Sequence, residues 1–456
     1  MGMSLDDLAG RLGPSRLITD ADMMEAYRRD QAHTVRPGHP LGVLLAETTD
    51  DVAAALAWAD ESKTPVVPRG GGTGLAGGAT ALDGGLVLST ERMTAIRELS
   101  ADDRLVVAEA GVLNADISRA TAEHGLMYAP DPSSYEISTI GGNIATNAGG
   151  LRCVKYGVTT DSVLGLEVVL ADGSLLKTGR RTVKGVAGYD LTSLFIGSEG
   201  TLGVITAANL KLRPRPEADP VTVVGSFPSL QSAGEAVAAV IRAGLTPSLM
   251  ELMDRATLRS INEWKNIGLD DSTVAMLIAQ DDGPDSAAAA AAMSAHFEKA
   301  GAEFVAQSAD RQEADQLLGI RRMAYGASER LGTCLVEDVC VPRSKLPDLL
   351  GRIEQISARN EVLIVTVAHA GDGNAHPTFV FDRQPDGEVP DAVWAAADEV
   401  FRTALDLGGT LTGEHGVGVL KRRWLPMELG QDVMDVHAAI KDALDPNRIL
   451  NPGKGF

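Results

Sequence analysis

The segment that decides the fold reads Val67-Pro68-Arg69-Gly70-Gly71-Gly72-Thr73-Gly74-Leu75-Ala76-Gly77. From Gly72 to Gly77 it matches G-x-G-x-x-G, which on its own indicates a nicotinamide-binding Rossmann unit. That fold needs a helix directly after the loop, so that the helix N-terminus meets the pyrophosphate. Residues 79–85 are too few and too rich in glycine for that helix. We therefore predict a loop whose backbone N–H groups cradle a phosphate, with Arg69 entering from the preceding strand; a purely structural turn is the alternative.

Two later clusters repeat this combination of glycine with small hydroxyl residues. One runs from Pro130 to Asn143, and the other from Gly197 to Gly203. Glycines this dense leave backbone donors exposed at a cost in conformational entropy. Three such loops in one domain predict an extended phosphorylated cofactor.

The three clusters resemble the FAD-domain motifs of the vanillyl-alcohol-oxidase, or FAD-linked oxidase, superfamily. The resemblance implies an α+β protein with a two-subdomain FAD-binding domain of the p-cresol methylhydroxylase (PCMH) type and an α+β, ferredoxin-like substrate or cap domain. Members with covalent FAD often carry a His in the first loop, where this chain has Thr73, so the resemblance implies non-covalent FAD. The tail Asn451-Pro452-Gly453-Lys454 resembles the family's segment that returns to the flavin domain. The implied flavin-binding residues are Arg69, Gly70, Gly71, Gly72, Thr73, Gly74, Pro132, Ser138, Gly141, Gly142, Asn143, Thr146, Glu199, Gly200, Gly203, Ile205 and Asn451.

Composition limits the classes of function. The 456 residues are 44% hydrophobic and 23% charged, as in an ordinary globular protein of about two domains. The net charge of −21 would repel nucleic acid and anionic membranes. No targeting pattern opens the chain and no long apolar run could span a membrane, so we expect no transmembrane segment and a cytoplasmic protein, or one peripheral to the inner membrane. The three cysteines form no CxxC pair and are expected to be buried thiols.

The order of β-rich and helical patterns predicts where the domains divide. A helix over 50–62, capped by Thr49 and Asp50, lies among short strands, and the Pro-rich stretch 213–216 ends this region. We predict an FAD-binding domain over 1–215, a substrate or cap domain over 216–410, and a segment over 411–456 that completes the active site. In the cap domain, strands and helices alternate over an antiparallel or mixed sheet. The strands predicted there are 221–227, 273–279, 336–341, 362–369 and 375–381.

The cap domain also contains the pattern His369-Ala370-Gly371-Asp372-Gly373-Asn374-Ala375-His376. The turn-forming residues between two strands could bring the imidazoles together. With Glu414 downstream, they fit a metal site of nitrogen and carboxylate ligands that leaves positions open for substrate. A purely structural hairpin is the alternative.

These residues resemble the signature of the FAD-dependent D-2-hydroxyacid dehydrogenases, and segments 338–342 and 412–416 look most like the D-lactate dehydrogenases. The resemblance implies a divalent metal, Zn or Mn above all, on His369, His376 and Glu414. It implies His415 as the catalytic base and a substrate-binding group. Arg321 would pair with the substrate carboxylate, although its neighbour Arg322 could take that place. Lys184 would lie near the substrate, or be an ordinary solvated Lys.

The resemblance thus implies oxidation of D-lactate to pyruvate, with a hydride passing from Cα to flavin N5 and then electrons to a cytochrome, a quinone or an electron-transfer flavoprotein. The alternatives are a glycolate oxidase-type subunit and a D-2-hydroxyglutarate dehydrogenase, although Pro377 and Thr378 stand where the latter carry a substrate-binding Asn. An oxidase using O2, a non-catalytic flavin subunit and a metal-dependent hydrolase also remain. A homodimer is compatible with the sequence.

Overall fold

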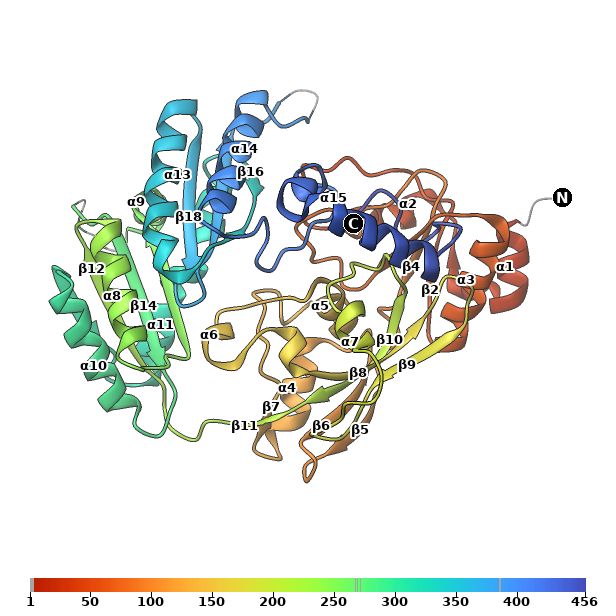
Figure 1. Cartoon of the computed structure of the whole chain (residues 1–456), viewed down its shortest axis with the longest axis horizontal. Coiled ribbons are helices and arrows are strands. Elements are labelled where there is room, and N and C mark those ends of the chain that lie inside the picture. The colour runs from red at the N-terminus through yellow and green to blue at the C-terminus, as the bar shows by residue number, and fades with distance from the viewer. Residues whose placement is uncertain (1–3, 267, 269, 271, 385–386) are drawn as a thin grey trace. The chain divides into compact units, whose positions relative to one another are not determined.

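The computed structural model describes residues 4–266, 268, 270, 272–384 and 387–456, which form two compact units (Figure 1). Unit 1 joins Met1–Gly150, Gly157–Arg215 and Glu414–Phe456, and unit 2 joins Leu151–Tyr156 and Pro216–Gly413. Residues 151–156 were predicted to belong to the FAD-binding domain over 1–215. The short helix α6 (Cys153–Tyr156) belongs instead to unit 2, because Lys155 Nζ and Tyr156 Oη donate to the buried Asp282 carboxylate at 2.5 and 2.8 Å.

Unit 1 begins with a four-stranded sheet in the order β1-β2-β4-β3. β2 (Gly42–Leu45) and β3 (Val66–Arg69) both run parallel to β4 (Leu86–Ser89), and β1 (Leu17–Ile18) pairs antiparallel with β2. Helix α3 (Thr49–Ser62) joins β2 to β3 and packs on the sheet through buried apolar residues. The predicted helix over 50–62 is therefore confirmed.

The predicted cap of that helix was wrong. Thr48 is the N-cap residue, and its hydroxyl accepts from the Asp51 N–H at 3.1 Å while the Asp51 carboxylate accepts from the Thr48 N–H at 3.0 Å. Such a reciprocal pair needs a hydroxyl residue and an acidic residue three positions later, which Thr48 and Asp51 supply. Thr49 and Asp50 therefore fall in the first turn of the helix.

The loop between β3 and β4 contains no helix over residues 70–85, all of which the structure describes. The rejection of a Rossmann unit is thus confirmed.

The second sheet of unit 1 is antiparallel, in the order β5-β6-β10-β8-β9. Its buried faces form one apolar core with α5 and α7. A separate two-stranded pair joins β7 (Leu126–Met127) to β11 (Arg213–Pro214). The other elements are α1 (Leu5–Leu12), α2 (Ala21–Met24), β5 (Ile96–Ser100), β6 (Leu105–Glu109), α4 (Asn114–Ala122), α5 (Ile140–Thr146), β8 (Val163–Val169), β9 (Leu175–Gly179), α7 (Leu191–Phe195), β10 (Val204–Lys211) and α15 (Leu425–Leu444).

Unit 2 is built on an antiparallel sheet in the order β15-β12-β14-β13-β18-β19-β16, with β17 also paired to β19. Its strands are β12 (Val221–Phe227), β13 (Leu249–Asp254), β14 (Ala275–Asp281), β15 (Phe304–Gln307), β16 (Thr333–Val336), β17 (Val339–Cys340), β18 (Leu363–His369) and β19 (Asn374–Phe381). Its longer helices are α8 (Leu230–Arg242), α9 (Arg255–Lys265), α10 (Ser286–Lys299), α11 (Arg311–Arg322), α12 (Ala324–Glu329), α13 (Leu346–Asn360) and α14 (Asp391–Asp406).

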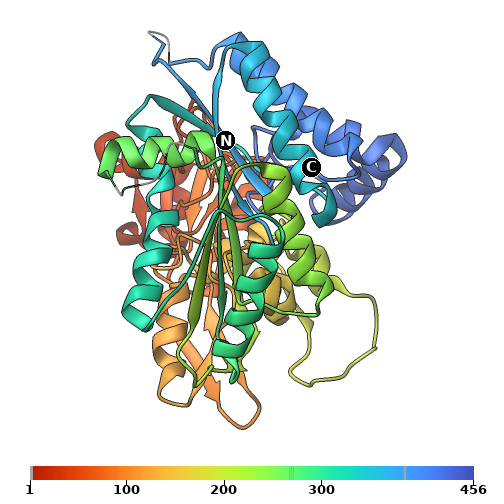
Figure 2. The ribbon, with the colours of Figure 1, turned by 90° about the vertical axis from the view of Figure 1, so that its left-hand side faces the viewer.

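Two features of unit 2 differ from the sequence prediction. The strand predicted over 336–341 is divided into β16, which ends at Val336, and β17, which begins at Val339, and the two residues between them, Glu337 and Asp338, are buried. Strands β13 and β15 were not predicted, and β13 occupies the middle of the sheet whereas β15 lies at its edge. Helices flank the sheet on both faces (Figure 2), and α9, α11 and α12 share an apolar core with Leu249 and Met253 of β13.

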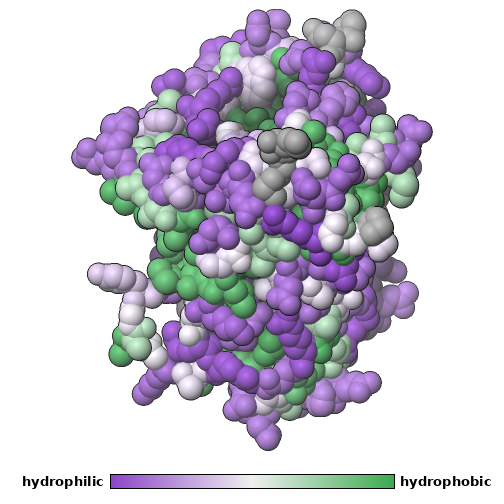
Figure 3. All heavy atoms as spheres, turned by 90° about the vertical axis from the view of Figure 1, so that its right-hand side faces the viewer, coloured by the Kyte–Doolittle hydropathy of each residue, from purple (hydrophilic) through white to green (hydrophobic). Residues whose placement is uncertain are grey.

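Much of the surface is hydrophilic. Figure 3 shows hydrophilic side chains over most of one face, with hydrophobic patches between them. Among the helices of the described residues, none has the length and apolar character needed to cross a membrane.

Candidate functional site

In unit 1 the first glycine loop packs directly against the second. A Cβ on Gly71 would lie 2.5 Å from the Ile137 carbonyl oxygen, and one on Gly70 would collide with the Thr139 hydroxyl. Thr139 is the N-cap of α5, and its hydroxyl accepts from the Gly142 N–H at 3.3 Å. Only residues without a side chain allow these two backbones to come so close.

The third loop and the C-terminal tail join the same cluster. The Glu199 N–H donates to Ala145 at the end of α5 at 2.8 Å. The Asn451 side-chain amide donates to the carbonyls of Gly78 and Glu199, at 3.0 and 2.8 Å. The structure therefore brings together all three loops that the sequence singled out, and the tail holds the first loop to the third.

Glu199 has a clear structural partner. Its buried carboxylate accepts from the N–H groups of Val417 and Gly418 at 2.7 and 2.8 Å. Burial raises the pKa of this carboxyl above its ordinary value, and the two backbone donors oppose that shift. In the structure, Glu199 thus fastens the returning C-terminal segment to the third loop.

The remaining predicted flavin-binding residues have several environments. Arg69 donates to the Arg29 carbonyl at 2.7 Å, and Thr146 bonds back to Gly142 within α5 at 3.2 Å. Ile205 packs in the core of the second sheet, so its side chain serves packing. Gly72 and Gly200 adopt φ of +68° and +70°, and Thr73 and Gly74 continue the first loop. Pro132 is buried. A Cβ on Gly141 would meet Ala110, and a Cβ on Gly203 would meet Val168.

Two buried polar atoms of the second loop have no hydrogen-bond partner among the residues that the structure describes. They are Ser138 Oγ and Asn143 Nδ2, and both residues are at least 95% buried. A buried polar atom without a partner is costly, so such atoms in a glycine-lined site indicate a polar ligand. The residues of unit 1 therefore fit a phosphorylated cofactor such as FAD.

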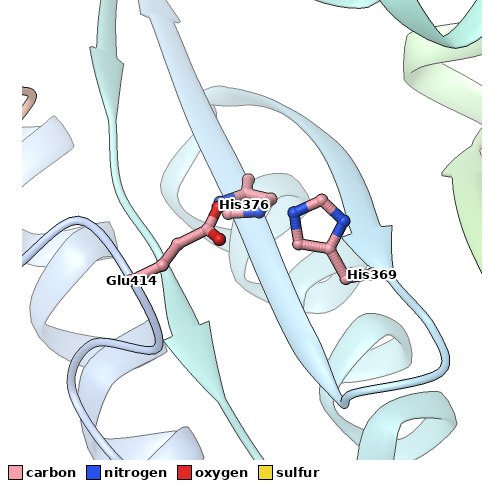
Figure 4. Close-up of side chains that lie close together, drawn as sticks. All are labelled: His369, His376 and Glu414. Carbon is pink, nitrogen blue, oxygen red and sulfur yellow. The ribbon is translucent and has the colours of Figure 1, made fainter. Parts of the chain in front are cut away.

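The metal-ligating residues predicted from the sequence also come together. His369 ends β18, His376 lies on β19, and residues 370–373 form the tight turn of this hairpin. Glu414 follows Gly413, the last residue of unit 2. Figure 4 shows the three side chains pointing toward one another, and one ligand atom from each lies within 4.8 Å of the others. Two imidazoles and a carboxylate, largely buried, fit Zn²⁺, Mn²⁺ or a related divalent ion.

A buried carboxylate that the sequence analysis missed holds the segment before Glu414. Asp338 Oδ1 accepts from the Thr412 hydroxyl at 2.9 Å, and Oδ2 accepts from the Gly413 N–H at 2.6 Å. Segment 338–342 was noted only as a family resemblance, and nothing in its pattern marked this contact. His415 Nε2 lies 3.8 Å from Glu414 Oε1, so the predicted base is adjacent to a predicted ligand.

The structure also separates the two candidate arginines. Arg321 is mostly buried and its Nε donates to Glu251 at 2.9 Å, whereas Arg322 is exposed. Lys184 lies in the segment 180–191, which is exposed throughout.

Family models match both parts of the chain. The model described as "FAD linked oxidases, C-terminal domain" matches residues 215–455, and the model described as "FAD binding domain" matches residues 40–179. The chain belongs to the FAD-linked oxidase family.

Relatives of this FAD-linked oxidase cover nearly its whole length. It is 43% identical to the glycolate oxidase subunit GlcD of Bacillus subtilis, over 91% of this chain and 89% of that one. It is 34% identical to a D-lactate dehydrogenase of Archaeoglobus fulgidus, over 96% and 97% of the two chains. The crystal structure of p-cresol methylhydroxylase shares the fold, with a TM-score of 0.80 at 17% identity over 99% and 95% of the two chains. The expected family and PCMH-type fold are therefore confirmed, and the protein is an FAD-linked oxidoreductase.

Proposed function

We propose that this oxidoreductase uses non-covalent FAD and a divalent metal to oxidise a small 2-hydroxy acid, D-lactate or glycolate, to the 2-oxo acid. The observation that carries the proposal is the buried cluster of His369, His376 and Glu414 in a chain with an FAD-binding domain. Relatives named as a glycolate oxidase subunit and as D-lactate dehydrogenases support the substrate class. The two substrates differ by one methyl group. The family match leaves the hydrolase alternative without support.

The reaction removes a hydride from Cα and a proton from the hydroxyl group. When bound, the flavin supplies the hydride acceptor and the metal supplies a Lewis acid that makes the substrate hydroxyl more acidic. His415 is suited to take the hydroxyl proton at Nε2 or Nδ1, because imidazole titrates near neutral pH. Arg321 is suited to hold the substrate carboxylate with its two Nη groups, since its Nε is engaged by Glu251.

We propose an electron acceptor other than O2, such as a cytochrome, a quinone or an electron-transfer flavoprotein. The relatives named as a subunit of glycolate oxidase support a partner for this chain. An oxidase that reduces O2 is the competing candidate.

Steady-state assays with glycolate, D-lactate and D-2-hydroxyglutarate would test the proposal. We expect reduction of an artificial dye with one of the first two substrates, loss of that activity after treatment with a chelator, and recovery on adding Zn²⁺ or Mn²⁺. Peroxide formation in air at the rate of dye reduction would support the O2-dependent oxidase instead. Full activity of a metal-free preparation would contradict the metal role.

A further inference from the structure

Glu251 is a fully buried carboxylate in the middle of the unit 2 sheet. It lies on β13, directly opposite His369 of the antiparallel neighbour β18. Directly opposed residues of an antiparallel pair project from the same face of the sheet. The strand register thus places Glu251 beside the first predicted metal ligand.

Each oxygen of this carboxylate bonds to a different predicted functional group. Oε1 lies 2.7 Å from His369 Nδ1, and Oε2 accepts from Arg321 Nε at 2.9 Å. His369 ends β18 and Arg321 lies in the last turn of α11. One side chain therefore joins the proposed metal site to the proposed substrate anchor.

The surroundings of Glu251 argue against a role in folding alone. Leu249 and Met253, two positions away on the same strand and face, pack in the apolar core beneath α9, α11 and α12. Burying a carboxylate on such a face is costly, and an apolar set of similar volume often folds as well or better. The two partners, in contrast, are the groups that the proposed reaction requires.

We propose that Glu251 is a positioning residue that orients His369 for the metal and Arg321 for the substrate carboxylate at the same time. This inference rests on the proposed function. Because a carboxylate can only accept, His369 must donate from Nδ1, and the nitrogen that binds the metal is then Nε2. The second oxygen fixes the Arg321 guanidinium through Nε and directs its Nη groups elsewhere. A change at Glu251 should therefore weaken both metal and substrate binding.

The variant Glu251→Gln tests this coupling, because an amide has one acceptor and one donor group. If its NH2 faces His369, Nδ1 must accept, and Nε2 then carries the proton and cannot bind a metal. If its NH2 faces Arg321, two donors oppose each other. The near-isosteric Gln thus cannot satisfy both partners in either orientation.

The experiment uses the full chain loaded with FAD. Affinity for Zn²⁺ and Mn²⁺ would be measured by competition with a chromophoric chelator, which requires no turnover, and kcat and KM would be measured separately. We expect Glu251→Gln to keep its flavin and to lose about 10- to 100-fold in metal affinity. We also expect its KM to rise about tenfold, as for the loss of one charged hydrogen bond.

Two controls separate the effects. Asp254→Asn changes another buried carboxylate of β13, which caps α9 by accepting from Thr257 N–H at 2.8 Å, and should leave metal affinity and KM unchanged. Arg321→Met should raise KM and leave metal affinity unchanged. If Glu251→Gln does not fold, Glu251→Asp keeps the charge but is too short to reach both partners, and the same double loss is expected.

The outcomes are distinct. Wild-type metal affinity and KM in Glu251→Gln, with only a lower melting temperature, would overturn the inference and leave the proposed function standing. Glu251→Ala, which leaves neither His369 nor Arg321 an acceptor at this position, should show both losses, and a loss in only one of the two quantities in that variant would overturn the coupling. A wild-type protein that binds neither metal would contradict the proposed function and the inference together.

Discussion

The candidate site of unit 1 is formed mainly by backbone groups, whereas the candidate metal site is formed by side chains. In unit 1 the backbone forms the site: glycines let three loops and the tail approach one another, and few charged side chains take part. The second site is formed by buried side chains: His369 and His376 of unit 2, and Glu414, the residue that directly follows unit 2, supported by the carboxylates of Glu251 and Asp338. The first kind of site therefore depends on the absence of side chains, and the second depends on a partner for each buried charged group.

The largest effect on kcat should come from removing a predicted metal ligand. We expect His376→Ala to lower kcat about a thousandfold or more, since a metal supplies several kcal/mol of charge stabilisation. The flavin should stay bound, because it belongs to the other unit. Metal analysis and the flavin spectrum would be measured, with His296→Ala on α10 as the control. If His376→Ala lost its flavin and kept its metal, the assignment of the metal site to the histidines of unit 2 and of the flavin site to unit 1 would be wrong.

The next effect should come from adding a side chain to the first loop. Gly71→Ala would place a methyl group against the Ile137 carbonyl and should force the first and second loops apart. We expect purified protein with little flavin and an unchanged Zn²⁺ affinity. Gly10→Ala, where a Cβ meets nothing within 4 Å, is the matched control. Full flavin content in Gly71→Ala would show that the loops do not need this close approach.

The two kinds of site, one built from backbone and the other from side chains, differ in how well the sequence predicts them. Glycine clusters mark a backbone site directly, so all three loops were found before the structure was known. In unit 2 the two histidines proposed as metal ligands were identified because His, Asp, Gly and Asn mark a turn between two strands. Their supporting carboxylates were not, because a partner distant in sequence leaves no local pattern.

Strand β13 shows what local sequence patterns cannot predict. Its residues, Leu249-Met250-Glu251-Leu252-Met253-Asp254, include no β-branched or aromatic side chain, which are the usual local signals of a strand. Only pairing with β14 and β18 makes it the middle of the sheet. The role of Glu251 therefore could not be predicted from the sequence, although this residue contacts His369 and Arg321, which were both predicted as site residues.

A smaller effect should separate the two arginines at the end of α11. We expect Arg321→Lys to raise KM by about tenfold and to change kcat less, because Lys loses the planar fork that binds a carboxylate in two places. The exposed neighbour provides the control, since Arg322→Lys should behave as wild type. The reverse pattern would move the substrate anchor to Arg322.

The last effect concerns stability rather than activity, and it is the pH dependence of the stability of unit 1. Burial lowers the pKa of Lys454 to about 7, and its Nζ donates to the carbonyls of Gly78 and Thr80. Because the folded state binds this proton less tightly than the unfolded state, the contribution of Lys454 to stability should fall as the pH drops from about 10.4 toward 7. Lys454→Met should flatten this dependence in melting temperatures measured across that range. An unchanged slope would exclude Lys454 as its source.

This FAD-linked oxidoreductase is proposed to oxidise D-lactate or glycolate. The most direct test mixes the metal-supplemented holoenzyme anaerobically with D-lactate, L-lactate or glycolate and records the visible absorption of the flavin. We predict rapid bleaching by D-lactate or glycolate and none by L-lactate. The proposal would be contradicted if none of the three compounds bleached the yellow protein. It would also be contradicted if L-lactate bleached the protein as fast as D-lactate.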